Sequence, residues 1–130
     1  MLNESSSEEE VISYIKRSSF AFIYYFDHKP WAQPYLDKAA ELAAERSSFA
    51  FLQSFQDKPW AQPYLDKAAK LTAEKNSYDF LCRFRDKPWA QPYLDKAAEE
   101  LAKSNPEYYM ENLAQDYPEY FVAAAYSLGD

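Results

Sequence analysis

The two most reactive side chains of the sequence, His28 and Cys82, are each the single residue of its type. His28 could act as a general base or metal ligand, and Cys82 as a nucleophile, if partner side chains surrounded them. They belong to the first and third copies of an internal repeat. Stacked units would place them about 20 Å apart, so we expect no bond between them. We therefore predict a protein that is not an enzyme and has no cofactor and no metal site.

Paired carboxylates are a second possible source of acid–base chemistry. Asp37 and Glu41 stand four residues apart, and Asp66 and Asp95 repeat the position of Asp37. This spacing places carboxylates on one face of a helix, where solvated groups are far more common than catalytic ones. We interpret them as a solvent-exposed polar face.

One local basic cluster is present, formed by Arg83, Arg85 and Lys87. Nucleic-acid binding needs a broad basic face, whereas the formal net charge of this chain is −7. We expect these cations to form surface salt bridges, and we predict no nucleic-acid partner.

The segment that must position these side chains is the sequence KPWAQPYLDKAA. It occurs three times without a change, beginning at Lys29, Lys58 and Lys87. A period of 29 residues is typical of stacked repeat proteins, in which each unit is one supersecondary element. Apolar stripes at helical spacing indicate two helices in each unit. The expected helix pairs lie near residues 19–46, 48–75 and 77–103.

Two prolines shape the start of the second helix in each pair. Pro59 can occupy a first turn, whereas Pro63 would clash with the carbonyl four residues before it in a continuous helix. We expect a single turn at 58–61, capped by Asp57, then a kink and the main helix from about Pro63. The nearby Trp60, like Trp31 and Trp89, is expected to be substantially buried, all three in equivalent places.

The repeat unit resembles the short two-helix repeats of α-solenoids, HEAT-like and TPR-like repeats among them. The matching features are an Asp before the second helix, an apolar pair and a later Ala-Ala step. In the second copy these are Asp57, Trp60, Ala61, Ala68 and Ala69. The arginine usual in that helix is absent, and the period is shorter than most. The resemblance implies an all-α solenoid and an interaction role.

We predict one solenoid domain over residues 1–130, with about nine helices. Its parts are an N-terminal cap at 1–17, repeats at 18–46, 47–75 and 76–104, and a C-terminal cap at 105–130. The caps are acidic: residues 1–15 carry a charge of −4 and residues 105–130 a charge of −5. Polar, atypical end units are what a stacked array needs for solubility.

Composition limits the compartment and the class of protein. The chain is 48% hydrophobic, contains one glycine and one cysteine, and has no apolar run long enough for a membrane span. Its acidic start lacks the basic segment of a secretory signal. We expect a cytoplasmic protein without a membrane partner, present as a monomer or with weak self-association.

The first helix of each pair changes among the copies while the second hardly does. The apolar positions Phe22, Phe51 and Phe80 are kept, so the changing positions lie away from the core. Aromatic and arginine residues at such positions are favoured in interfaces. We predict that a protein or peptide partner contacts Tyr24, Tyr25, Gln53, Ser54, Cys82, Arg83 and Arg85.

Two alternatives to a binding module stay open. A small acidic inhibitor or mimic, for example one encoded by a phage, would act through the charged ends. A designed repeat built from a consensus would have no function, and near-identity of the copies fits that origin as well as recent duplication.

Overall fold

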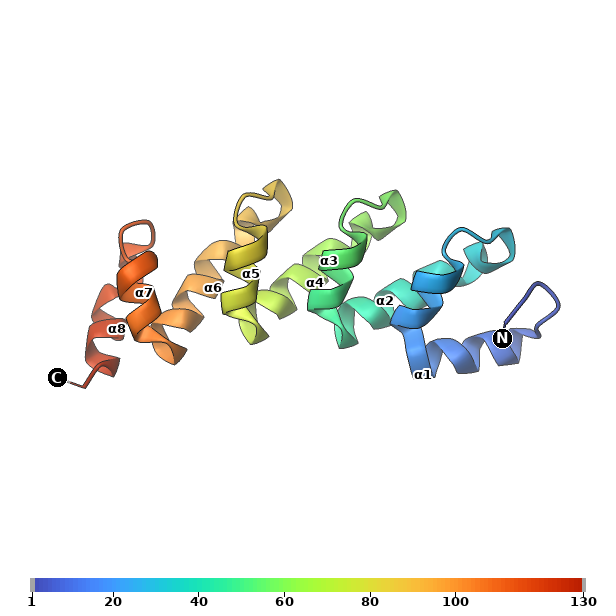
Figure 1. The fold of residues 1–130 in the computed structure, drawn as a ribbon, viewed down its shortest axis with the longest axis horizontal. Helices are drawn as coiled ribbons and strands as arrows, with labels where there is room; N and C mark the ends of the chain where they lie inside the picture. The colour runs from blue at the N-terminus through green and yellow to red at the C-terminus, as the bar shows by residue number, and fades with distance from the viewer. Residues whose placement is uncertain (1, 130) are drawn as a thin grey trace. The chain divides into compact units, whose positions relative to one another are not determined.

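The computed structural model describes residues 2–129, and every regular element in this part of the chain is helical (Figure 1). Residues 2–129 contain eight α-helices, four short 3-10 helices and no strand. The all-α prediction is therefore confirmed. The chain divides into two compact units, Met1–Ala68 and Ala69–Asp130, and the division falls inside one helix.

Unit 1, residues Met1–Ala68, contains the first two copies of the first helix. Its elements are α1 (Glu8–Phe26), η1 (Pro30–Tyr35), α2 (Leu36–Arg46), α3 (Ser48–Phe55), η2 (Pro59–Ala61) and the start of α4 (Gln62–Lys75). Helix α1 bends at Ser18, whose φ of −145° and ψ of 59° are not helical (Figure 1). The expected N-terminal helix and the first helix of the first repeat are thus joined at one bend. This is why eight α-helices are present where about nine were expected.

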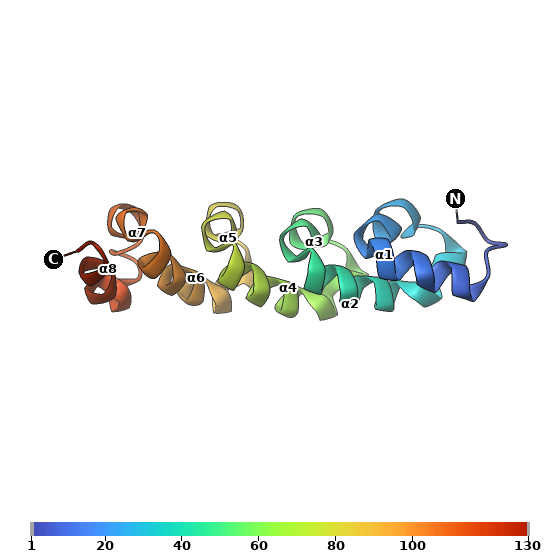
Figure 2. The same cartoon turned by 90° about the horizontal axis from the view of Figure 1, so that it is seen from below.

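Unit 2, residues Ala69–Asp130, contains the rest of α4 and two further helix pairs. Its other elements are α5 (Ser77–Phe84), η3 (Pro88–Ala90), α6 (Gln91–Ser104), α7 (Pro106–Asn112), η4 (Pro118–Tyr120) and α8 (Phe121–Ser127). Figure 2 shows α5 and α7 in one layer and α6 and α8 in the other. Helix α6 packs against α5, α7 and α8, so it is the centre of this unit.

A single residue joins each second helix to the next first helix. Ser18, Ser47, Asn76 and Asn105 share φ values between −129° and −145° and ψ values between 51° and 69°. The backbone supplies the bonds at this junction: Ser47 N donates to Ala43 O at 2.8 Å. Ser47 O then accepts from Phe51 N, also at 2.8 Å. At these junctions the Asn105 side chain accepts from Tyr108 N at 3.3 Å, whereas the Ser47 and Asn76 side chains form no cap bond.

The turn at KPWAQP has the predicted geometry but a different cap. The 3-10 helix η2 holds Pro59 in its first turn, and α4 begins at Gln62, as expected from the two prolines. The residue in the cap position is Lys58, which forms no side-chain cap bond, so the prediction that Asp57 caps this turn is wrong. Instead Gln62 Nε2 donates to Gln56 O at 3.0 Å and to Lys58 O at 3.1 Å.

The same glutamine clamp is present at the other two copies. Gln33 Nε2 donates to Asp27 O and Lys29 O, and Gln91 Nε2 donates to Arg85 O and Lys87 O, all at 2.9 to 3.0 Å. The amide thus joins a carbonyl before the turn to the carbonyl of the lysine that opens it, which also accepts from the backbone: Ala61 N donates to Lys58 O at 3.0 Å. The clamp therefore recurs in all three copies, although the 3-10 helix of the first copy, Pro30–Tyr35, is longer than Pro59–Ala61 and Pro88–Ala90.

The core of each unit consists of phenylalanines from the first helices and alanines from the second. Phe22, Phe51 and Phe80 have an exposed fraction of 0%. Alanines at the packing face allow close approach of the helices, and the largest side chains fill the remaining space. The buried alanines include Ala39, Ala40, Ala43, Ala44, Ala68, Ala69, Ala97 and Ala98.

The three tryptophans occupy equivalent places and are largely covered without being fully buried, as expected. Trp60 has its ring centroid 6.2 Å from Phe51 and 5.3 Å from Phe55. Trp89 lies 6.3 Å and 5.2 Å from the corresponding rings of Phe80 and Phe84. Each indole therefore packs against a pair of phenylalanine rings and remains partly exposed.

None of the helices between residues 2 and 129 combines the length and apolar character needed to cross a membrane.

Candidate binding surface

The most exposed aromatic surface of unit 1 lies on the second half of α1. Tyr24 is 61% exposed and Tyr25 is 51% exposed. The rings of Tyr24 and Tyr25 meet edge to face, with centroids 5.2 Å apart and planes at 87°. Phe20, one turn earlier, stacks on Tyr24 at 6.4 Å and 21°. Exposed tyrosines that contact mainly other rings have interface chemistry, because each offers apolar area with a polar tip.

Phe20 also connects this surface to the neighbouring helix. Its ring centroid lies 5.2 Å from that of Phe55, so the second half of α1 and α3 are side by side. Phe20, Ala21, Tyr24 and Tyr25 line an open hollow of about 260 Å³. We call these four residues the tyrosine surface. On α3 the predicted contact residues Gln53 and Ser54 are both exposed.

Charge is absent from the helical segments around this surface. Segments 18–26 and 47–55 contain no Asp, Glu, Lys, Arg or His. The nearest carboxylate along the chain, Asp27, lies 3.6 Å from His28 Nδ1 and 4.0 Å from Lys58 Nζ. His28 is therefore an exposed neighbour of Asp27.

The corresponding face of unit 2 is polar. Cys82 Sγ lies 3.9 Å from Tyr108 Oη, and either atom can be the donor. The Tyr108 ring meets Tyr78 edge to face, with centroids 4.9 Å apart. Burial and the contact with Cys82 raise the pKa of the Tyr108 hydroxyl. The exposed Cys82 therefore lies within a cluster of tyrosines formed by α5 and α7.

Arg85 extends the polar face of unit 2. It forms an ion pair with Asp116, and its guanidinium lies 5.6 Å from the ring centroid of Tyr117. Arg85 is half-buried, whereas Arg83 is exposed. The predicted salt-bridging role of the basic cluster is thus confirmed for Arg85. Its partner comes from the C-terminal segment.

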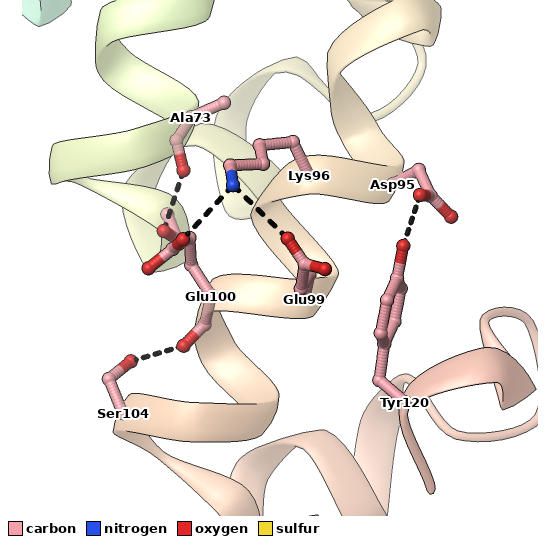
Figure 3. Close-up of polar contacts among 8 residues, drawn as sticks. Ala73, Asp95, Lys96, Glu99, Glu100, Ser104 and Tyr120 are labelled. Atoms are coloured by element: carbon pink, nitrogen blue, oxygen red, sulfur yellow. Dashed lines mark hydrogen bonds and ion pairs between the residues drawn. The ribbon is translucent and has the colours of Figure 1, made fainter. Parts of the chain in front are cut away.

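Each unit contains a tyrosine–carboxylate contact, and it involves aspartates that were expected to be solvated. In unit 1 the Tyr64 hydroxyl donates to Asp37 Oδ1 at 3.0 Å. In unit 2 the Tyr120 hydroxyl donates to Asp95 (Figure 3). Burial raises the pKa of Tyr64, and the bond to Asp37 adds to the shift. The pKa of Tyr120 is also raised, chiefly by the bond to Asp95 and then by burial.

The remainder of the acidic face of α6 is also engaged. Lys96 Nζ lies 3.1 Å from Glu99 Oε1 and 3.4 Å from Glu100 Oε1 (Figure 3). These carboxylates raise the pKa of Lys96. The described residues contain no group of three or more His, Cys, Asp or Glu side chains that could hold a metal ion.

The structure separates the predicted contact residues into two groups. Tyr24, Tyr25, Gln53 and Ser54 are exposed in unit 1, whereas Cys82, Arg83 and Arg85 belong to unit 2. Sequence reasoning missed the partners of these residues: Phe20, Tyr78, Tyr108, Asp116 and Tyr117. Continuing the 29-residue period into the degenerate C-terminal segment aligns Asn105 with Asn76, and that alignment would have indicated the pairing of α5 with α7.

Comparison with known proteins gives no match: no family model, no curated protein and no solved structure corresponds significantly to this chain.

Proposed function

We propose that this protein is a non-catalytic helical-repeat module that binds a protein or peptide through its first-helix face. The observation that carries the proposal is the pair of exposed tyrosines, Tyr24 and Tyr25, on a helix whose other face is fully buried. Interface energy is concentrated in a few aromatic and arginine residues. We place the centre of that interface energy at this exposed ring pair.

We further propose that the three copies form a solenoid of HEAT-like or TPR-like repeats. The support is local: the junction backbone, the glutamine clamp and the tryptophan packing recur with the 29-residue period. In repeat proteins of this kind one helix layer carries the binding residues while the other holds the units together. The variable first helices and constant second helices fit that division.

An open surface suits a macromolecular partner better than a small substrate. The hollow at the tyrosine surface has a volume of about 260 Å³, below the roughly 300–1,000 Å³ of small-molecule sites. Its lining residues include no carboxylate, imidazole, thiol or amine for acid–base work. We therefore propose contact with a peptide segment or a protein surface at this place.

Selection from a library of random dodecapeptides tests the function. The full chain is compared with the double variant Tyr24→Ala/Tyr25→Ala and with Tyr78→Ala, a control that removes a tyrosine 49% exposed in unit 2. We expect selected peptides to bind the full chain and the control equally, and to lose at least tenfold in affinity for the double variant.

Two results would count against this function. Peptides that bind the double variant as well as the full chain would place the site elsewhere. Binding that disappears in 0.5 M salt and in Glu107→Gln/Glu111→Gln, but not in the tyrosine variant, would favour the acidic mimic, because exposed charges are strongly screened at that ionic strength.

A further inference from the structure

We propose that the tyrosine surface binds a proline-rich segment in the polyproline II conformation. This inference rests on the proposed function, because it names the chemical class of the peptide that the first-helix face recognises. The four residues of the tyrosine surface, together with the neighbouring Gln53, carry the argument.

The tyrosine surface is uncharged. Segments 18–26 and 47–55 carry no charged side chain, and the adjacent Asp27 is already close to His28 and Lys58. A cationic peptide would find no free carboxylate at the tyrosine surface, and a phosphorylated peptide would find no arginine cluster. Electrostatic complementarity therefore favours a ligand that is uncharged where it makes contact.

The aromatic lining of the tyrosine surface has the shape of a corner. Phe20 and Tyr24 are nearly parallel, and Tyr25 stands at 87° to Tyr24, so the rings form a corner. Ala21, the smallest of the four lining residues, leaves space beside that corner. A pyrrolidine ring is rigid and apolar, and it can pack against one ring face while touching the other. Aromatic-lined surfaces are the usual receptors of proline-rich segments.

Exposed hydrogen-bond donors lie at the tyrosine surface. A polyproline II segment has no internal backbone hydrogen bonds, so its carbonyls remain available to donors from a receptor. The Tyr24 and Tyr25 hydroxyls and the amide of Gln53 are exposed donors on adjacent helices. Proline itself lacks an N–H group, so a receptor without an acidic acceptor loses nothing.

The small size of the tyrosine surface favours a ligand that is already ordered before it binds. A surface with a hollow of about 260 Å³ contacts few side chains and cannot offset the ordering of a flexible peptide. A proline-rich segment is already extended before it binds and loses less conformational freedom. This property matches a small, open and aromatic surface.

Titration of the ¹⁵N-labelled full chain with decaproline tests the inference, with a glycine–serine decapeptide and a decalysine as comparison ligands. We expect decaproline to shift the amide resonances of residues 20–26 and to bind equally at 50 mM and 500 mM salt. Tyr24→Ala/Tyr25→Ala should weaken binding at least tenfold. Tyr78→Ala should leave it unchanged.

The alternative occupants give different results. Preferential binding of decalysine, weakened by salt, would overturn the inference in favour of a cationic ligand. Concentration-dependent dimerisation that depends on Tyr24 and Tyr25, seen by analytical ultracentrifugation, would show that a second copy covers the surface. Library peptides that need these tyrosines but lack proline would overturn the inference while leaving the proposed function intact. If no library peptide depends on the tyrosines, both fail.

Discussion

The first-helix faces of the two units have the same backbone and opposite chemistry. In unit 1, Tyr24 and Tyr25 contact each other and neighbouring rings on a surface without charge. In unit 2, the equivalent positions are Cys82 and Arg83, beside a tyrosine cluster and the Arg85–Asp116 ion pair. The difference shows that the buried positions of the repeat fix its local structure and leave the exposed positions free to diverge.

Removing a tryptophan should have the largest effect on stability, and the effect should be similar in the two units. Trp60→Ala and Trp89→Ala should each lower the free energy of unfolding by about 2–3 kcal/mol, less than the 3–5 kcal/mol typical of fully buried tryptophan, because each ring is half-buried. Urea denaturation followed by circular dichroism measures both. Costs that differ by more than about 2 kcal/mol would mean that the two phenylalanine–tryptophan sites are not equivalent.

The glutamine clamp predicts a smaller effect, again equal in the two units. Gln62→Ala and Gln91→Ala each remove two hydrogen bonds to exposed carbonyls and should cost about 1 kcal/mol of stability. Gln53→Ala, at an exposed position of α3, is the matched control and should cost less than about 0.5 kcal/mol. Equal melting curves for the three variants would show that the clamp contributes nothing.

The tyrosine–carboxylate contact predicts a dependence on alkaline pH. The pKa of Tyr120 is raised in the folded chain from its ordinary value of 10.0, so the folded state holds this proton more tightly than the unfolded state. The stabilisation is complete below about pH 10 and is lost as the pH rises through the folded-state pKa. The full chain should therefore lose more stability between pH 9 and pH 11 than Tyr120→Phe does.

Two further variants make the alkaline test specific. Tyr64→Phe should also lose less stability than the full chain between pH 9 and pH 11, since the pKa of Tyr64 is also raised. Tyr126→Phe removes a tyrosine that is 84% exposed and should behave as the full chain. Thermal melts at each pH give the comparison, and identical pH profiles for the full chain and Tyr120→Phe would contradict it.

The exposed faces themselves should contribute least to stability. Tyr24→Ala/Tyr25→Ala should change the free energy of unfolding by less than about 0.5 kcal/mol. Arg85→Ala, which removes an ion pair between partly exposed side chains, should cost about 0–1 kcal/mol. A larger loss in the tyrosine variant would mean that the tyrosine surface supports the fold, and its binding role would lose its basis.

The local fold could be predicted from sequence because the strongest constraints are local. The prolines of KPWAQP fix a short turn before the second helix, and the 29-residue period fixes where each helix begins. The prediction that Asp57 caps this turn was wrong because it used only nearness in sequence. The carbonyls that accept from the Gln62 amide come close to it only when the turn closes.

The candidate surface was predictable in part. Exposure of Tyr24, Tyr25, Gln53 and Ser54 followed from the conserved apolar stripe of the copies, because helical spacing separates the two faces. The partners of Cys82 and Arg85 did not follow, since Tyr108 and Asp116 lie in the segment where the repeat degenerates. Without the exact repeat, sequence spacing no longer shows which residues meet.

The bond between Tyr120 and Asp95 has a consequence for the gene. Tyr120 makes with Asp95 the contact that Tyr64 makes with Asp37, so the C-terminal segment fits behind any copy of KPWAQPYLDKAA. Near-identical tracts recombine, and loss of residues 59–87 would join Lys58 to Pro88 with the motif intact. Tyr93 would then take the place of Tyr64. Alleles with two or four copies should therefore encode folded chains, in which length varies and the tyrosine surface is retained.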